Sequence, residues 1–348
     1  MKKILAALLA LISMMTASAF AEDKLSIVCT TFPQYDWVRQ ILGAHADDVE
    51  LTLLLDNGID LHNYQPTAAD IAKISSSDLF IYVGGESDGW VGDVLATAQN
   101  PNLKTVNMLE SVEAKEEETV EGMQEEEHDH DHGEEFTEED IEDRTLADLA
   151  PASLDKEGIL DMLTDHEHEV EYDEHVWLSL RNAEKLTQVI ADALSELDPD
   201  NDAVYQENAG NYIAQLNELD NQYKDAVTSG QRKTILFADR FPFRYLADDY
   251  GLTYYAAFVG CSAETEASFE TIAFLAKKVD ELKLPVVLTI EGDNHSIAKT
   301  VVSSTQEKNQ KILVMNSLQS VTANDIADGE SYLGIMTENL EVLKEALS

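Results

Sequence analysis

The stretch from Tyr172 to Thr228 constrains the fold of this chain more than any other segment. Residues 182–197 have the pattern of one helix, which a turn at Asp198-Pro199-Asp200 ends. A second helix is predicted from about Asp202, because apolar residues recur at alternating steps of four and three along one face: Tyr205, Ala209, Tyr212, Leu216, Leu219, Tyr223 and Ala226. Such a helix spans roughly 40 Å, so we expect a rigid spine along two α/β lobes, with a ligand site between them.

The segments before and after this spine share one plan, in which short apolar runs alternate with helical patterns. Apolar runs of this kind predict parallel sheets that are covered on both faces. The predicted fold class is therefore α/β, with two lobes that each hold a four-stranded, mostly parallel sheet flanked by helices, joined by one long rigid linker helix. The predicted strands are 25–31, 49–55, 78–83 and 103–106 before the spine, and 233–238, 252–258, 285–290 and 312–315 after it.

The first residues have the features of an export signal. A basic start at Lys2-Lys3 precedes an apolar run, 4–15, and an Ala19-x-Ala21 ending. The run is too short for a membrane anchor, which needs about 20 apolar residues. We expect residues 1–21 to be a cleaved signal peptide and the mature protein to be periplasmic or otherwise extracytoplasmic. The predicted domains are then an N-terminal lobe at 22–198, a linker helix at 199–229 and a C-terminal lobe at 230–348.

The charge of the chain points to cations as partners. A net charge of -45 argues against nucleic acid, whose phosphates would be repelled. Residues 113–143 carry seventeen Asp and Glu against the single base Lys115, and they include His128, His130 and His132. This composition cannot bury a core and predicts a mobile, acidic, His-rich loop.

Metal-ligating side chains are expected directly after strands, because ligands bind at the carboxyl ends of parallel strands. His62 follows the second predicted strand, His175 begins the spine, and His295 and Asp239 follow strands of the second lobe. Simpler interpretations are a solvated His62, a packed His175 bonded to a neighbouring carboxylate, and a helix cap near His295. Three imidazoles with a carboxylate suit zinc best, with manganese as the other possibility.

Two histidine motifs resemble those of the zinc- and manganese-binding solute receptors of ABC importers. The loop Gly58-Ile59-Asp60-Leu61-His62-Asn63-Tyr64-Gln65-Pro66 matches the family pattern Gly-x-Asp-x-His-x-Tyr-x-Pro, and residues 173–178 match Asp-x-His-x-Trp-Leu. The resemblance implies that His62 and His175 are metal ligands and that the partner is a membrane permease. It also implies a monomer and, because of the acidic His-rich loop, a preference for zinc.

Two positions depart from the family pattern. The third ligand of the family falls on Arg240, which cannot bind a metal, so either Asp239 replaces it or the position is lost. The fourth falls on His295, which shifts the ligand set towards nitrogen and favours zinc. The predicted metal site is therefore His62, His175, His295 and Asp239, with Glu291 or water as the alternative for the last ligand.

The predicted function is high-affinity extracytoplasmic binding of a divalent transition metal, most simply zinc, and its delivery to an ABC importer. The alternative is a secreted zinc-dependent hydrolase, but the sequence contains neither His-Glu-x-x-His nor Gly-x-Ser-x-Gly. A passive acidic calcium binder would explain the charge but not the placed histidines. Cys29 and Cys261 can either pair or stay as half-buried thiols, and unpaired thiols are favoured because a bridge would lock the lobes.

Overall fold

The computed structural model describes residues 24–123, 171–262, 266–292 and 294–348. The predicted signal peptide and most of the acidic segment, with its histidines, lie outside these ranges. Within the described ranges, no helix combines the length and the apolar character that crossing a membrane requires.

The first lobe is built on a parallel sheet in the order β2-β1-β3-β4. The order reverses direction next to β1, and in such sheets the ligand crevice lies outside the carboxyl ends of the strands. Its strands are β1 (Ser26–Cys29), β2 (Glu50–Leu53), β3 (Leu79–Tyr82) and β4 (Lys104–Asn107). Its helices are α2 (Phe32–Leu42), α3 (Ala68–Ser76), α4 (Val91–Ala96) and α5 (Met108–Ser111), with short 3-10 turns η1 (Gly43–Asp48), η2 (Leu61–Asn63) and η3 (Glu86–Asp88).

The second lobe repeats this plan with the order β6-β5-β7-β8, again with parallel neighbours. Its strands are β5 (Thr234–Phe241), β6 (Thr253–Val259), β7 (Val286–Thr289) and β8 (Lys311–Val314). Its helices are α10 (Arg244–Tyr250), α11 (Phe269–Leu282), α12 (Ser296–Ser304), α13 (Ala323–Asp328) and α14 (Tyr332–Ala346). The prediction of two four-stranded parallel sheets flanked by helices is confirmed.

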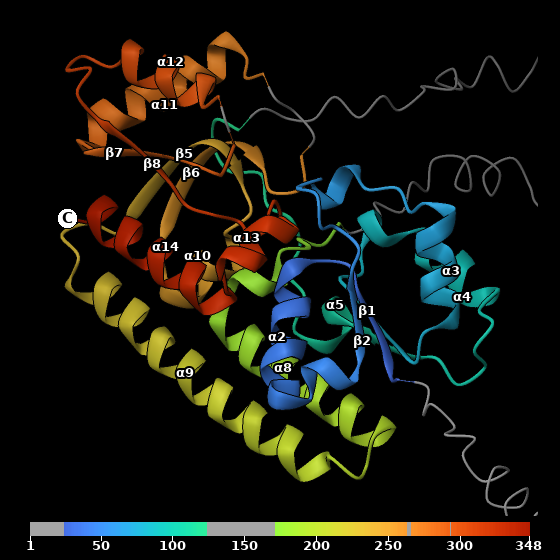
Figure 1. Cartoon of the computed structure of the whole chain (residues 1–348). Helices are drawn as coiled ribbons and strands as arrows, with labels where there is room; N and C mark the ends of the chain where they lie inside the picture. Colours follow the sequence, from blue (N-terminus) through green and yellow to red (C-terminus); the bar gives the residue numbers. More distant parts are fainter. Residues whose placement is uncertain (1–23, 124–170, 263–265, 293) are drawn as a thin grey trace, which may run out of the picture.

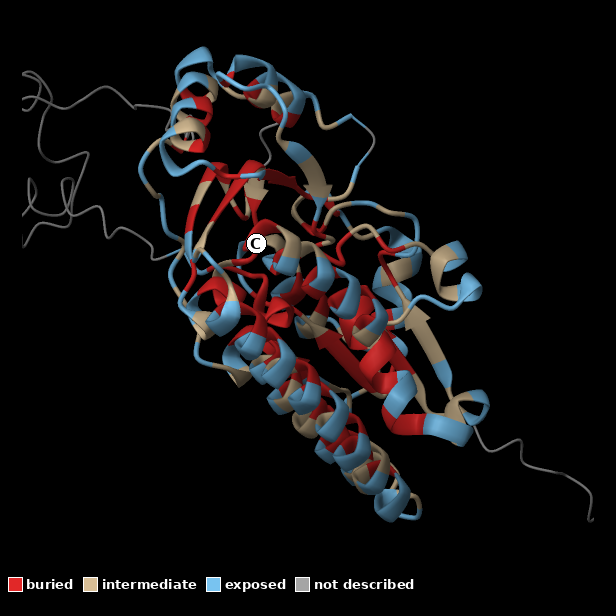
Figure 2. Ribbon diagram, turned by 90° about the vertical axis from the view of Figure 1, so that its left-hand side faces the viewer, coloured by how far each residue is buried: buried red, intermediate tan, exposed pale blue. Residues whose placement is uncertain are grey.

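The spine consists of η5 (Val176–Leu178), α8 (Leu180–Leu197) and α9 (Asp202–Ser229). The predicted stripe of α9 is buried, together with Val227, while the outer face of the helix is exposed (Figure 2). Figure 1 shows α9 running past both lobes, and its buried face packs against α8 and α2 towards one end and against α14 towards the other. At the far end, the Tyr223 hydroxyl donates to the Met336 carbonyl at 2.6 Å. One apolar core therefore runs from the first lobe through the spine into the second.

The structure differs from the sequence prediction at element ends and in two short helices, α5 and α13. Several strands are shorter than predicted: β1, for example, spans Ser26–Cys29, whereas the predicted strand is 25–31. Helix α13 was not predicted, although Thr322 and Asp325 form a capping box at its start. Both cysteines are free, as predicted, but Cys29 is fully buried and only Cys261 is half-buried.

The segment that leads into the spine is bonded directly to the second lobe. The Trp177 indole donates to the Ser317 carbonyl at 2.8 Å, and the Tyr332 hydroxyl donates to the Trp177 carbonyl at 2.6 Å. The Tyr245 hydroxyl donates to the Asp173 carbonyl at 2.8 Å. Three buried hydrogen bonds thus fix the residues around His175 against the second lobe.

Candidate metal centre

His175 is completely buried at the start of η5. Its Nδ1 lies 3.0 Å from Asp173 Oδ1, and its backbone N–H donates to the same oxygen at 2.8 Å. Burial disfavours the imidazolium, but the neighbouring carboxylates, Asp173 above all, outweigh it and raise the pKa of His175. Because the carboxylate accepts from Nδ1–H, the Nε2 lone pair is directed away from Asp173. This is the arrangement in which an outer carboxylate orients a metal-binding imidazole.

His62 lies in η2, directly after the loop that leaves β2. The N-cap Asp60 accepts from the His62 backbone N–H at 3.0 Å. The ring Nδ1 lies 2.8 Å from Ser87 Oγ and 3.5 Å from Glu174 Oε2. Burial, followed by the proximity of His175, lowers the pKa of His62 to about 3. The ring is therefore neutral at physiological pH, and with Nδ1 bonded to Ser87 its Nε2 can act as a ligand.

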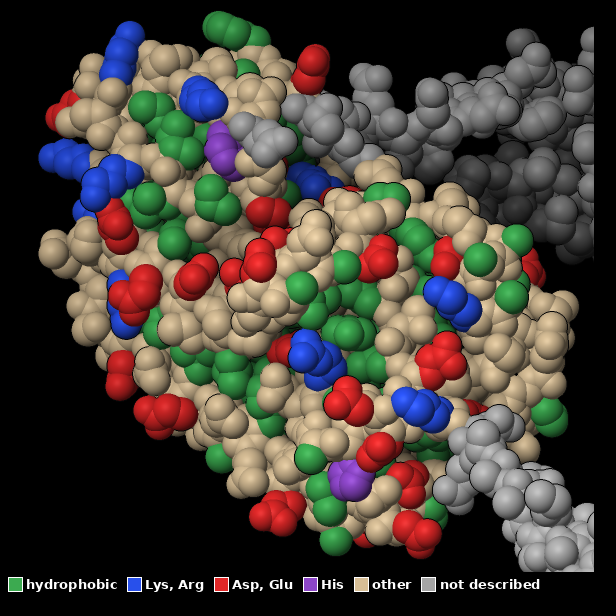
Figure 3. All heavy atoms as spheres, viewed as in Figure 1, with side chains coloured by type: hydrophobic (Ala, Val, Ile, Leu, Met, Phe, Trp, Pro, Cys, Tyr) green, Lys and Arg blue, Asp and Glu red, His purple; other side chains and the backbone are tan. Residues whose placement is uncertain are grey.

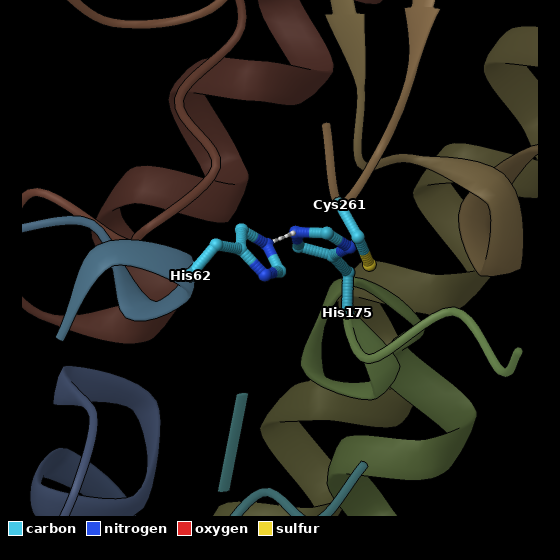
Figure 4. Close-up of side chains that lie close together, drawn as sticks. All are labelled: His62, His175 and Cys261. Atoms are coloured by element: carbon cyan, nitrogen blue, oxygen red, sulfur yellow. Dashed lines mark hydrogen bonds between the residues drawn. The ribbon is translucent and has the colours of Figure 1, made fainter. Parts of the chain in front are cut away.

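The Nε2 atoms of His62 and His175 face each other at 3.2 Å, as Figure 4 shows. Two imidazole ligands of a tetrahedral zinc ion, each 2.0–2.1 Å from the metal, stand about 3.3–3.4 Å apart. The pair is therefore spaced almost as a zinc ion would hold it. The His62 ring comes from the first lobe, and the His175 ring comes from the start of the spine.

Cys261 is the third member of the cluster of potential ligand atoms that lie within 4.8 Å of one another in the described part of the chain. In Figure 4 its sulfur lies beside the His175 ring, on the side away from His62. Burial, then the negative charges of Asp173 and Glu117, raise the pKa of the Cys261 thiol well above its ordinary value. A protonated thiol in this position packs against the ring and does not face the space between the two Nε2 atoms.

Gln319 approaches the pair from the second lobe, in the loop after β8. Its side chain is 4% exposed, and its amide Nε2 lies 3.0 Å from His175 Nε2. Its Oε1 is buried and has no hydrogen-bond partner among the described residues. Rotating the amide by half a turn exchanges the two atoms and presents a carbonyl oxygen to the histidine pair. The sequence prediction missed Gln319, although its place shortly after a strand could have indicated it.

The other two predicted ligands, His295 and Asp239, meet at Thr289, the last residue of β7. His295 is the N-cap of α12, and Asp239 lies within β5, whereas the sequence predicted it after the strand. His295 Nδ1 is 3.3 Å from Thr289 Oγ1, and the same hydroxyl is hydrogen-bonded to Asp239 Oδ2. Neither side chain belongs to the cluster around His62 and His175 in the ranges that the structure covers. Glu291, the alternative ligand, accepts from the Ser317 N–H and hydroxyl at 2.7 and 2.6 Å.

The chain as a whole is acidic, with a formal net charge of -45. Figure 3 shows Asp and Glu side chains over both lobes on one face of the molecule, with Lys and Arg side chains among them. A negative net charge raises the local concentration of cations. The centre can therefore attract a divalent ion and offers it two oriented imidazoles.

Comparisons with known proteins agree with this chemistry. The family described as "Zinc-uptake complex component A periplasmic" matches residues 27–346. The zinc-binding lipoprotein AdcA of Streptococcus pneumoniae is 32% identical over 93% of this chain, which spans only 56% of that relative. The high-affinity zinc uptake system protein ZnuA of Bacillus subtilis is 29% identical, with 93% of this chain and 88% of the relative covered. The Zn(II)-bound ZnuA-like domain of S. pneumoniae AdcA superposes with a TM-score of 0.65 at 28% identity, covering 93% of this chain and 99% of the domain.

Proposed function

The chain belongs to the family of periplasmic components A of zinc-uptake complexes, and on that premise we propose that it captures zinc between its lobes and delivers it to an ABC importer. The observation that carries this proposal is the His62–His175 pair, with its Nε2 atoms 3.2 Å apart. Each ring is oriented through Nδ1 by a separate partner, so that both Nε2 atoms are available to one ion.

A zinc ion between these two nitrogens needs further ligands. Among the described residues, Gln319 reaches the pair from the second lobe, with its amide nitrogen within hydrogen-bond distance of His175 Nε2. Because its amide oxygen Oε1 has no hydrogen-bond partner there, Gln319 is our proposed third ligand. His295 and Asp239 remain predictions as ligands. To reach the ion, their side chains would have to break their contacts with the Thr289 hydroxyl. Imidazole nitrogens with a neutral oxygen favour zinc over manganese, which prefers more oxygen ligands.

The proposal also covers where the protein acts and with what partner. We infer an extracytoplasmic monomer that delivers zinc to the membrane permease of an importer and catalyses no reaction. The relatives named for zinc binding and zinc uptake support capture and transport. The secreted hydrolase gains no support from the family match.

Competition for zinc against a chelator of known affinity, with the metal-stripped protein, tests this function. The variants H62A and H175A should each bind zinc at least about 100-fold more weakly, because each removes an oriented imidazole. His45 bonds Asp48 at 3.1 Å on an exposed turn, so H45A is a matched control and should bind as the wild type does. H295A and Q319A then decide which second-lobe side chain completes the site. Wild-type affinity in both H62A and H175A would refute the proposal.

A further inference from the structure

Arg240, near the end of β5, carries its guanidinium across to the first lobe. Its pairing register with β6 is interrupted between Phe237 and Arg240, a local irregularity that redirects side chains at a strand end. Nη2 donates to Asp60 Oδ2 at 2.6 Å, and Nη1 donates to the Ser262 carbonyl at 3.0 Å. The Arg240 and Asp60 side chains are only 16% and 17% exposed. The ion pair is therefore fixed at both ends and partly shielded from water.

This ion pair is joined directly to a proposed metal ligand. While Oδ2 of Asp60 accepts from Arg240, its Oδ1 accepts from the His62 backbone N–H at 3.0 Å. One carboxylate therefore connects the guanidinium of Arg240 with the backbone that positions the His62 ring.

A guanidinium keeps its proton at every physiological pH and cannot ligate a metal. A positive charge beside a divalent ion disfavours binding, and a carboxylate in the same place favours it. Two neutral imidazoles and a neutral amide leave the ion with its full charge. The nearby charged side chains, Asp173 on the His175 ring and the Asp60–Arg240 pair on the His62 loop, therefore weigh on affinity.

We propose that the Asp60–Arg240 ion pair sets the zinc affinity of this centre, with Arg240 weakening binding and Asp60 compensating for it. The inference rests on the proposed function and adds a regulation of the same site. A receptor has to release its ion as well as capture it. A guanidinium from the second lobe, bonded to the carboxylate that accepts from the His62 N–H, keeps affinity below the maximum that the ligands could give.

Two single variants with opposite expected effects test this inference. R240M removes the positive charge and frees the Asp60 carboxylate, so zinc should bind on the order of tenfold more tightly. D60N keeps an oxygen acceptor for the His62 N–H but leaves Arg240 uncompensated, so zinc should bind on the order of tenfold more weakly. The double variant should return to within about threefold of the wild type. R240K keeps the charge and should stay close to the wild type.

The matched control is R181M, because Arg181 of α8 also pairs with carboxylates, those of Asp220 in α9 and Asp249 in α10. Its zinc affinity should be unchanged. If R240M and D60N both weaken binding, the ion pair merely positions the His62 loop and the inference is overturned. An unchanged affinity in R240M would also overturn it. If the wild-type protein binds no zinc, the proposed function itself fails, which the competition experiment on the wild type shows separately.

Discussion

Gly260 packs against the back of the His175 ring so closely that one added methyl group should disturb the metal centre. A Cβ at this position would lie 3.2 Å from His175 Cε1 and Nδ1, and 2.9 Å from the Phe241 carbonyl oxygen. Comfortable contacts between such atoms are about 3.5–4.0 Å. In G260A, either the Gly260–Ser262 loop or the His175 ring has to move by roughly half an ångström.

The Phe241 oxygen belongs to a strand and cannot yield easily, so the His175 ring should take up much of this shift. The ligands of a binding site have to be held within about 0.5 Å of their productive positions, so a shift of this size reaches the limit. We therefore expect G260A to bind zinc about tenfold more weakly and to lose about 1–3 kcal/mol of unfolding free energy through overpacking. Zinc competition and urea denaturation of the same preparations measure the two effects.

Gly210 supplies the matched control for this substitution. It lies on the exposed face of α9, and a Cβ there would meet nothing within 4 Å. Because glycine weakens a helix interior, G210A should gain about 0.5–1 kcal/mol of stability and bind zinc unchanged. Wild-type affinity and stability in G260A would show that its loop moves freely, and our account of how His175 is held would be refuted.

Three further predictions concern the acidic segment, a buried carboxyl group and lobe motion. Deleting residues 124–143 should leave one tight zinc site and remove weaker ones in calorimetry. The deletion has to spare residues up to 123, because Glu117 accepts from the Cys261 N–H and Glu121 pairs with Lys278. If the number of zinc ions bound per protein does not change, the segment has no metal role. Burial raises the pKa of Asp88 to about 6, so the protonated carboxyl group stabilises the fold most below the unfolded pKa of about 4, and this stability is lost as pH rises through 6. D88N cannot ionise and should therefore reduce the loss of unfolding free energy between pH 4 and 7 by up to about 3 kcal/mol relative to the wild type. Identical pH profiles of D88N and the wild type would contradict this. X-ray scattering curves of metal-free and zinc-loaded protein should nearly overlay, because α9 packs on both lobes, whereas a fall of several ångströms in the radius of gyration would show a flexible hinge.

Much of the fold followed from periodicity. The stripe of α9 was predicted residue by residue, because a face buried along a whole helix leaves an unambiguous spacing. Strand ends were less well predicted, because buried apolar residues continue beyond the assigned strands. Leu54 and Leu55 follow β2, are buried, and still donate to the Cys29 and Thr30 carbonyls. Helix α13 has no buried residue, so periodicity could not indicate it.

The side chains that meet at the candidate centre were predicted only in part, for a physical reason. His62 and His175 could be named because both belong to recognisable motifs and imidazole is a common ligand. Gln319 carries a neutral amide that has no distinctive spacing, and its contact with His175 depends on how the two lobes meet. The distance of His295 and Asp239 from the histidine pair likewise depends on lobe geometry, which local sequence does not encode. Arg240 was noted as a departure, but its bond to Asp60 appears only in three dimensions.

The central claim is that one zinc ion binds between His62 and His175. An anomalous difference map at the zinc edge, from crystals of the zinc-loaded protein, tests it most directly. We predict a single strong peak in the described interlobe region, about 2.0–2.1 Å from Nε2 of both histidines. A peak beside Asp239 and His295, with the His62–His175 pair left empty, would contradict the account.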